Sequence, residues 1–229
     1  MRALKLNFFD TTTTARSGTA RRDAIRRVGD PQFTESHRAF GYDYFDNPAL
    51  GVGYGGYTYD GRFAEPVKQV IAHYGLKPGD TILELGCAKG FILVEFLRQG
   101  MSVTGIDRSE YALANAHPDV RPYLQAGDFR TLPFSDASFD LVLAKDTLEH
   151  NPEPAMRSAV MECMRVAKGP ILFQICVGRT PGEIAAMPKW DQSYTVNHTP
   201  EWWDAFFQEI WFRGDVHYKI LLREEENVS

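Results

Sequence analysis

Short apolar runs alternate with amphipathic segments between residues 62 and 177. Five runs have the length of buried strands, and they cover residues 81–85, 101–106, 123–126, 139–144 and 171–177. Apolar residues at helical spacing precede the first run and fill the longer intervals, at residues 62–73, 91–98, 109–116 and 154–167. Such an alternation predicts an α/β fold, with a doubly wound, mostly parallel sheet flanked by helices.

The N-terminal flank has a different pattern. Residues 1–36 show no sustained apolar period, which predicts a loop or arm with at most a short helix at 23–28. Residues 40–61 interleave glycine with tyrosine, a composition unsuited to a regular helix or a central strand. This segment could lie over a ligand as a lid, or it could be a surface loop pinned by buried tyrosines.

The C-terminal flank is also irregular. Residues 179–199 are proline-rich, and we expect an irregular insert there, followed by a helix at 200–210 with Thr199 as its N-cap. One strand is expected at about 216–222, with room for a short partner at 211–214, which would make a shortened C-terminal hairpin. Three parts follow: an arm and lid segment (1–61), a domain (62–223) and an acidic tail (224–229).

Four acidic residues follow the predicted strands at regular intervals. Glu84, Asp107, Asp128 and Asp146 are separated by 23, 21 and 18 residues, which is the length of one strand–helix unit. Because the carboxyl ends of parallel strands meet at one edge of the sheet, these side chains should converge on one ligand crevice.

The turn after the first strand has small residues at Gly86, Ala88 and Gly90, and a helix starts directly after it. A ligand can therefore approach bare backbone and the free N–H groups of the helix. Phe91 stands where a dinucleotide-binding fingerprint or a phosphate-binding loop would need a glycine, so neither motif is matched.

The sequence Glu-Leu-Gly-Cys-Ala-Lys-Gly at 84–90 resembles the first motif of the class I S-adenosylmethionine-dependent methyltransferases, E/D-x-G-x-G-x-G. Ala88 replaces its middle glycine. Residues 132–142 look like the L-P-F-x-D-x-S-F-D-x-V signature of the small-molecule (methyltransferase type 11-like) subgroup. Leu148-Glu149-His150 fits the same subgroup. The resemblance implies a Rossmann-like methyltransferase fold, with S-adenosyl-L-methionine as cofactor and S-adenosyl-L-homocysteine as product.

The resemblance also implies a role for each matched position. Asp107 would accept hydrogen bonds from both ribose hydroxyls, and Asp128 would accept from the adenine amino group with Phe129 beside the ring. Tyr59 and Arg62 would reach the cofactor from the Gly/Tyr-rich segment, with Arg62 pairing with the methionine carboxylate. The remaining expected cofactor residues are Glu84, Gly86, Cys87, Ala88, Gly90, Arg108 and Lys145.

Charge, cysteine content and the lengths of the apolar runs restrict the expected partners and cellular setting of the protein. The net charge is −5 over 229 residues, although residues 1–40 carry a net +4 and the remainder a net −9. This balance makes nucleic acid an unexpected partner. The three cysteines have no paired spacing, which indicates a reducing, cytoplasmic setting and no zinc site. No apolar run reaches the length of a membrane span.

These observations predict methyl transfer to an oxygen, or to a nitrogen, of a small metabolite such as a sugar or natural product. A hydroxyl acceptor benefits from a general base, and the candidates are His150, His198 and Asp146, whereas an amine need only be unprotonated. No metal site is expected. The alternatives are an RNA or protein methyltransferase guided by the basic arm, and a S-adenosylmethionine-binding regulator without catalysis. The oligomeric state is not predicted.

Overall fold

The computed structural model describes residues 2–3, 7–9, 33–50 and 52–220. Within these ranges, seven strands form one sheet in the order β1-β7-β6-β5-β2-β3-β4. The strands are β1 (Arg2–Ala3), β2 (Thr81–Leu85), β3 (Ser102–Asp107), β4 (Leu124–Ala126), β5 (Leu141–Lys145), β6 (Ile171–Val177) and β7 (Asp215–Ile220). Every neighbouring pair is parallel, which confirms the predicted fold class.

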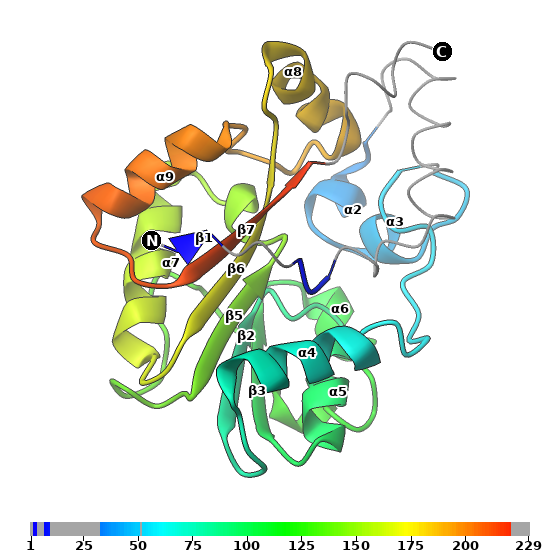
Figure 1. Cartoon of the computed structure of the whole chain (residues 1–229). Coiled ribbons are helices and arrows are strands. Elements are labelled where there is room, and N and C mark those ends of the chain that lie inside the picture. Colours follow the sequence, from blue (N-terminus) through cyan, green and yellow to red (C-terminus); the bar gives the residue numbers. More distant parts are fainter. Residues whose placement is uncertain (1, 4–6, 10–32, 51, 221–229) are drawn as a thin grey trace.

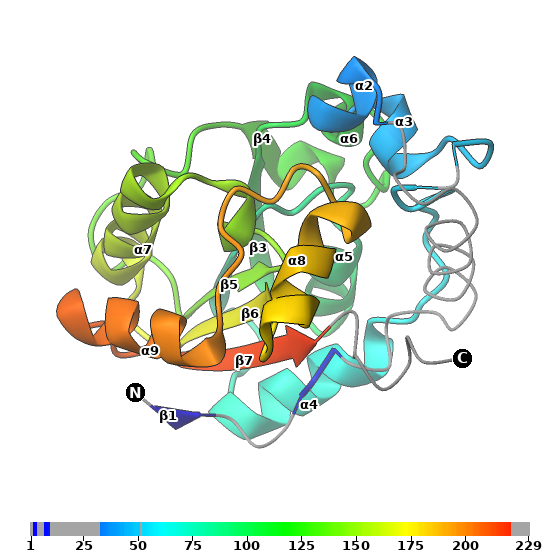
Figure 2. The ribbon, with the colours of Figure 1, turned by 90° about the horizontal axis from the view of Figure 1, so that it is seen from above.

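Helices cover both faces of this sheet (Figures 1 and 2). One face carries α4 (Ala64–Tyr74), α5 (Phe91–Arg98) and α6 (Glu110–Ala114). The other face carries α7 (Glu153–Val166) and α9 (Pro200–Glu209). The hydrophobic core has two parts, one on each face of the sheet, because the buried strands direct apolar side chains toward the helices on both sides.

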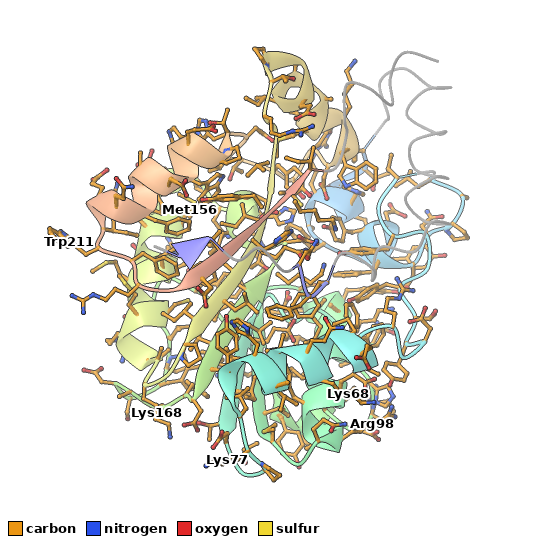
Figure 3. All side chains as sticks on the ribbon, in the orientation of Figure 1. Lys68, Lys77, Arg98, Met156, Lys168 and Trp211 are labelled. Carbon is orange, nitrogen blue, oxygen red and sulfur yellow. The ribbon has the colours of Figure 1, made fainter. Side chains whose placement is uncertain are left out.

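Side-chain burial matches the two layers. Met156 of α7 is fully buried against the sheet, whereas Trp211, in the turn after α9, is 80% exposed (Figure 3). No helix among the described residues has the length and apolar character needed to cross a bilayer.

Three further helices lie beyond the carboxyl ends of the strands (Figure 1). They are α2 (Glu35–Arg38), α3 (Tyr42–Phe45) and α8 (Pro181–Trp190). The helical turn α3 was not expected in the Gly/Tyr-rich segment, and it forms because the glycines flank it instead of interrupting it.

The expected C-terminal hairpin is wrong within the described residues. Residues 211–214 form no strand, and β7 runs parallel to β6, with Leu172 opposite Asp215. Helix α9 carries the chain back along the sheet between β6 and β7, so the returning strand points in the same direction as β6. The other neighbour of β7 is β1, from the segment expected to be an arm.

The expected irregular insert is also corrected, because residues 181–190 form α8. Thr180 caps this helix by accepting a hydrogen bond from the Glu183 N–H at 3.1 Å. Pro181 stands in the first turn, where its missing N–H is not needed. The expected cap of α9 is confirmed, since Thr199 accepts from the Trp202 N–H. The expected helix at 23–28 and the acidic tail at 224–229 lie outside the described residues.

Candidate functional site

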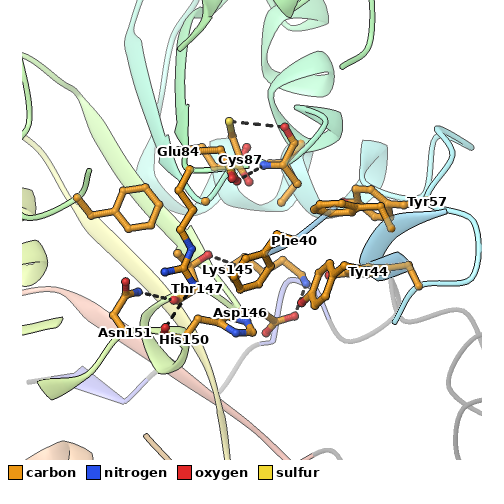
Figure 4. A pocket seen from close by; sticks show the side chains of 18 residues that line it. Phe40, Tyr44, Tyr57, Glu84, Cys87, Lys145, Asp146, Thr147, His150 and Asn151 are labelled. Atoms are coloured by element: carbon orange, nitrogen blue, oxygen red, sulfur yellow. Dashed lines mark hydrogen bonds and ion pairs between the residues drawn. The ribbon is translucent and has the colours of Figure 1, made fainter. Parts of the chain in front are cut away.

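A pocket with an empty volume of about 680 Å³ lies at the carboxyl ends of β2, β3 and β5 (Figure 4). The strand ends, the turns that follow them and the first turn of α5 contribute Glu84, Gly86, Cys87, Ala88, Ile92, Asp107, Arg108, Phe129, Lys145, Asp146, Thr147, His150 and Asn151. The N-terminal segment closes it with an aromatic wall of Phe40, Tyr44, Phe45, Tyr54 and Tyr57. The pocket is therefore polar on the sheet side and aromatic on the opposite side.

The turn after β2 needs its glycine for two reasons. Gly86 has a φ of 69°, in the left-handed region that side chains rarely adopt. A Cβ at Gly86 would also come within 2.3 Å of the Thr147 hydroxyl oxygen. Backbone of Gly86, Cys87 and Ala88 consequently forms part of the pocket surface.

Asp107 ends β3 and joins this turn to the next. Its Oδ2 accepts the Ala88 N–H at 2.7 Å, and its Oδ1 accepts the Ser109 N–H at 2.7 Å. Burial raises the pKa of Asp107, and these backbone hydrogen bonds oppose the rise. Because a carboxylate has about four acceptor positions, each oxygen can still accept a hydrogen bond from a ligand.

Glu84 brings an unsatisfied acceptor to the pocket. The side chain is 3% exposed, and its Oε2 has no hydrogen-bond partner among the described residues. Burial raises the pKa of Glu84, while the nearby Lys145 lowers it. A buried carboxylate oxygen without a partner is unfavourable, so a donor or cation on a ligand would stabilise this side chain.

Asp146 is held by cations. Lys145 Nζ lies 2.6 Å from its Oδ2, Lys219 Nζ lies 3.5 Å from the same oxygen, and Gln174 Nε2 donates to Oδ1 at 2.8 Å. Burial would raise the pKa of Asp146, but the two ammonium groups and these hydrogen bonds bring it well below its usual range. The carboxylate is therefore ionised, fixed and a poor proton acceptor near neutral pH.

His150 lies in a short 3-10 turn (Leu148–His150) after β5 and lines the pocket (Figure 4). Its ring packs edge-on against Phe40 and next to Tyr194. Its Nδ1 lies 2.9 Å from the Ser193 hydroxyl oxygen. Burial lowers the pKa of His150, so the imidazole is neutral at pH 7 and has one nitrogen able to accept a proton.

One ion pair connects the aromatic wall to the turn after β2. Lys89, 5% exposed, places Nζ 2.6 Å from Asp46 Oδ2 and donates to the Tyr57 carbonyl at 2.8 Å. Asp46 also accepts from the Tyr111 hydroxyl at 2.7 Å and from the Tyr57 N–H at 3.0 Å. We call residues 40–57 the lid segment from here on.

Of the residues expected at the site, the lining includes Glu84, Gly86, Cys87, Ala88, Asp107, Arg108, Phe129, Lys145, Asp146 and His150. Arg108 also lies 4.4 Å over the Phe40 ring and so supports the aromatic wall. The Gly/Tyr-rich composition of residues 40–61 suggested either a lid over a ligand or a surface loop. It did not indicate which aromatic side chains would line the pocket.

Five expected residues lie outside the lining. Gly90 is the N-cap of α5, Tyr59 bonds to Glu95 and Arg98, and Arg62 pairs with Asp60 at 2.7 Å. Asp128 is half exposed and bonds to Arg130. The ring of His198 stacks on Trp202 with 3.9 Å between centroids.

A second polar cluster shares Asp146 with the pocket. Asp146, Glu149 and Cys176 offer ligand atoms within 4.8 Å of one another. Burial raises the pKa of Glu149 to about 8, and Asp146 is neutralised by two ammonium groups. Because the ammonium groups of Lys145 and Lys219 already pair with Asp146, we assign no metal ligands to this cluster.

Comparisons with known proteins match the central part of the chain to methyltransferases. Residues 83–170 match the family model described as a methyltransferase domain. An uncharacterised protein of Haemophilus influenzae is 30% identical over 158 residues, which cover 63% of each chain. A ubiquinone biosynthesis O-methyltransferase of Hahella chejuensis is 34% identical over 45% of this chain and 46% of its own. The chain thus spans about half to two thirds of the length of these relatives.

Two further comparisons are with a relative that methylates carbon and with a solved structure. The sterol 24-C-methyltransferase ERG6B of Gibberella zeae is 30% identical over 52% of this chain and 33% of its own. The YcgJ protein of Bacillus subtilis superposes with a TM-score of 0.53 over 63% of this chain and 66% of its own, at 21% identity. That similarity concerns the fold alone.

Proposed function

We propose that the chain is a class I S-adenosylmethionine-dependent methyltransferase that moves a methyl group from S-adenosylmethionine to an oxygen of a small metabolite, or to a nitrogen. The observation that supports this most is the pocket at the strand ends. It combines a bare backbone turn, a carboxylate with acceptor capacity to spare and a buried carboxylate oxygen without a partner.

These features fit the chemistry of S-adenosylmethionine. Asp107 can accept hydrogen bonds from two vicinal hydroxyls, one on each oxygen. Glu84 Oε2 can accept from an ammonium group, which would also favour the ionised carboxylate. Gly86 and Ala88 allow a bulky ligand to approach main chain. When bound, the cofactor supplies a methyl group on a sulfonium, which is already strongly electrophilic.

Five other assignments stay hypotheses. Gly90 is the N-cap of α5, so it would affect the cofactor by positioning the start of that helix. Asp128 would have to give up its hydrogen bond with Arg130 to reach the adenine. Tyr59 and Arg62 would have to leave their present partners, and His198 would have to leave Trp202. The cofactor contacts that we favour are therefore those made by pocket-lining residues.

We propose a hydroxyl acceptor, such as one on a sugar or natural product. The aromatic faces of Phe40 and Tyr44 suit an apolar or ring-shaped acceptor, and Tyr44 and Tyr54 add hydroxyls for a polar one. The O-methyltransferase relatives favour an oxygen over a carbon, although the match covers only part of each chain. The net negative charge of residues 41–229 argues against a nucleic-acid substrate. The three free, buried cysteines favour a reducing, cytoplasmic setting.

His150 is the base that we favour for a hydroxyl acceptor. It lines the pocket and is neutral at pH 7, as proton abstraction requires. Asp146 is bound by two lysines, and His198 lies outside the pocket lining. An amine acceptor would need only an unprotonated lone pair, with the pocket providing position and orientation.

Thermal unfolding with added ligands tests the cofactor assignment. S-adenosylmethionine and S-adenosylhomocysteine should raise the melting temperature as RT ln(1 + [L]/Kd) increases, while NAD and ATP should not. A larger shift with NAD would contradict the proposal. Transfer of label from S-adenosylmethionine to panels of hydroxylated metabolites, amines, RNA and protein then tests the acceptor class. Binding without transfer to any panel would favour a regulator.

A further inference from the structure

The chain after α8 returns to the edge of the pocket and brings two polar residues to His150. Asp191 is the residue directly after α8, and Ser193 follows two positions later. Figure 2 shows α8 over the ends of the central strands. This segment belongs to the insert at 179–199, which lies outside the matched methyltransferase region at 83–170.

The three side chains form one hydrogen-bonded chain. Asp191 is 2% exposed, and its Oδ1 accepts both the Ser193 N–H, at 2.9 Å, and the Ser193 hydroxyl. The Ser193 oxygen lies 2.9 Å from Nδ1 of His150. Two hydrogen bonds to one carboxylate oxygen fix the serine backbone and side chain together.

The direction of each hydrogen bond follows from the number of protons. A hydroxyl has one proton, and Ser193 donates it to the Asp191 carboxylate. The Ser193 oxygen can then only accept from His150, so Nδ1 must carry a proton. In a neutral imidazole the other nitrogen, Nε2, is then the proton acceptor.

We propose that Ser193 and Asp191 are positioning residues that fix the tautomer of His150, so that Nε2 is the nitrogen that takes the proton of a hydroxyl acceptor. The inference rests on the proposed function, because it assigns a base to that reaction. In the transfer step, the acceptor O–H bond breaks and its proton moves to Nε2. The oxygen forms the bond to the methyl carbon while the carbon–sulfur bond breaks and its electron pair stays on sulfur. His150 then returns the proton to solvent.

The charges around His150 explain why the carboxylate matters. Asp191 and Asp146 favour the imidazolium, whereas Arg108 and the buried surroundings oppose it. The imidazole of His150 also contacts three aromatic rings, those of Phe40, Tyr44 and Tyr194. Asp191 favours the imidazolium more strongly than Asp146 does, so Asp191 contributes more to stabilising the charge that develops when His150 takes a proton.

Nitrogen-15 NMR of the imidazole groups tests the tautomer without any acceptor. In the native chain His150 should show a protonated Nδ1 and an unprotonated Nε2. Ser193→Ala should shift His150 toward the other tautomer, and Ser193→Thr should keep the native pattern because it keeps the hydroxyl. Asp191→Asn should keep the tautomer, since an amide oxygen still accepts, but should lower the His150 pKa because the negative charge near the imidazole is lost.

Gln192→Ala is the matched control, because Gln192 is exposed between the two residues and should leave the spectrum unchanged. A native His150 protonated at Nε2, or one unchanged by Ser193→Ala, would overturn the inference. Thermal shift with S-adenosylmethionine, measured on the same samples, separates the two proposals. A native His150 protonated at Nε2, with cofactor binding intact, refutes only the inference, whereas absence of binding by the native chain refutes the proposed function.

Discussion

The ammonium of Lys89 and the carboxylate of Asp46 form an ion pair of 2.6 Å that joins the turn after β2 to the lid segment. Lys89 stands between Ala88 and Gly90, so the residue that holds the lid lies within the expected cofactor motif. The ammonium of Lys89 thus connects this turn to the wall that covers the pocket.

Lys89→Met should loosen the lid segment. The substitution leaves Asp46 half-buried without its cation, and breaking a largely buried pair by removing one partner costs about 3–5 kcal/mol. Hydrogen exchange across residues 40–57 should rise at least about tenfold, and the affinity for S-adenosylmethionine should fall.

Lys68→Met, at an exposed site on α4, is the matched control and should change neither property. In the native chain, added S-adenosylmethionine should slow hydrogen exchange across residues 40–62. Ordering a glycine-rich segment costs conformational entropy, and the binding free energy of the ligand offsets that cost. The four samples are the native chain with and without S-adenosylmethionine, Lys89→Met and Lys68→Met. Equal hydrogen exchange in all of them would mean that the segment is a static surface feature.

Asp107→Ala should weaken S-adenosylmethionine binding more than the same change at any other single carboxylate. Each hydrogen bond to a charged group contributes about 1.5–3 kcal/mol, so the loss should be tenfold or more. Because Asp107 also accepts from Ala88 and Ser109, Asp107→Asn is the second variant, and it should lose less. Asp128→Ala serves as an exposed comparison in the same calorimetric titrations. Unchanged affinity in a folded Asp107→Ala protein would refute the assignment.

His150→Gln should reduce turnover of a hydroxyl acceptor by about 10²–10⁴-fold, with cofactor affinity nearly unchanged. Since burial lowers the pKa of His150, the base stays unprotonated at pH 7, and the rate should fall only at a pH more acidic than the ordinary histidine pKa. His198→Gln should keep near-full turnover, because His198 lies outside the pocket lining. If the histidine variants exchange these behaviours, His198 is the base; if both remain fully active, neither is.

Glu149→Gln should stabilise the protein in alkaline solution. The folded-state pKa of Glu149 is about 8 and its ordinary value is 4.5, so the folded protein binds the extra proton between these values. Stability attributable to this group is present below pH 4.5 and is lost as the pH rises toward 8 and beyond. Gln resembles the protonated acid and can still accept the Cys176 N–H, which Glu149 accepts at 3.0 Å.

The melting-temperature difference between Glu149→Gln and the native chain should therefore grow from pH 5 to pH 9. Glu162→Gln, at a partly buried glutamate that pairs with Arg165, should not show this growth. A constant difference over the whole range would mean that Glu149 is ionised in the fold.

The sequence alone determined the layers and the edge of the sheet where the site would lie. Apolar runs of strand length, separated by helical periods, have few ways to bury both faces, and parallel strands bring their carboxyl ends together. Hence Glu84, Asp107 and Asp146 could be expected at one pocket, where the structure places them.

Only the tertiary structure decided which distant segments complete that pocket. The aromatic wall comes from residues 40–57, held by Asp46 on Lys89, and the partners of His150 come from residues 191–193. Neither contact leaves a periodic signal, because each depends on where a connecting segment returns. The same reason explains β7: its direction follows from the crossover through α9, and a strand of the same composition could have formed the expected hairpin.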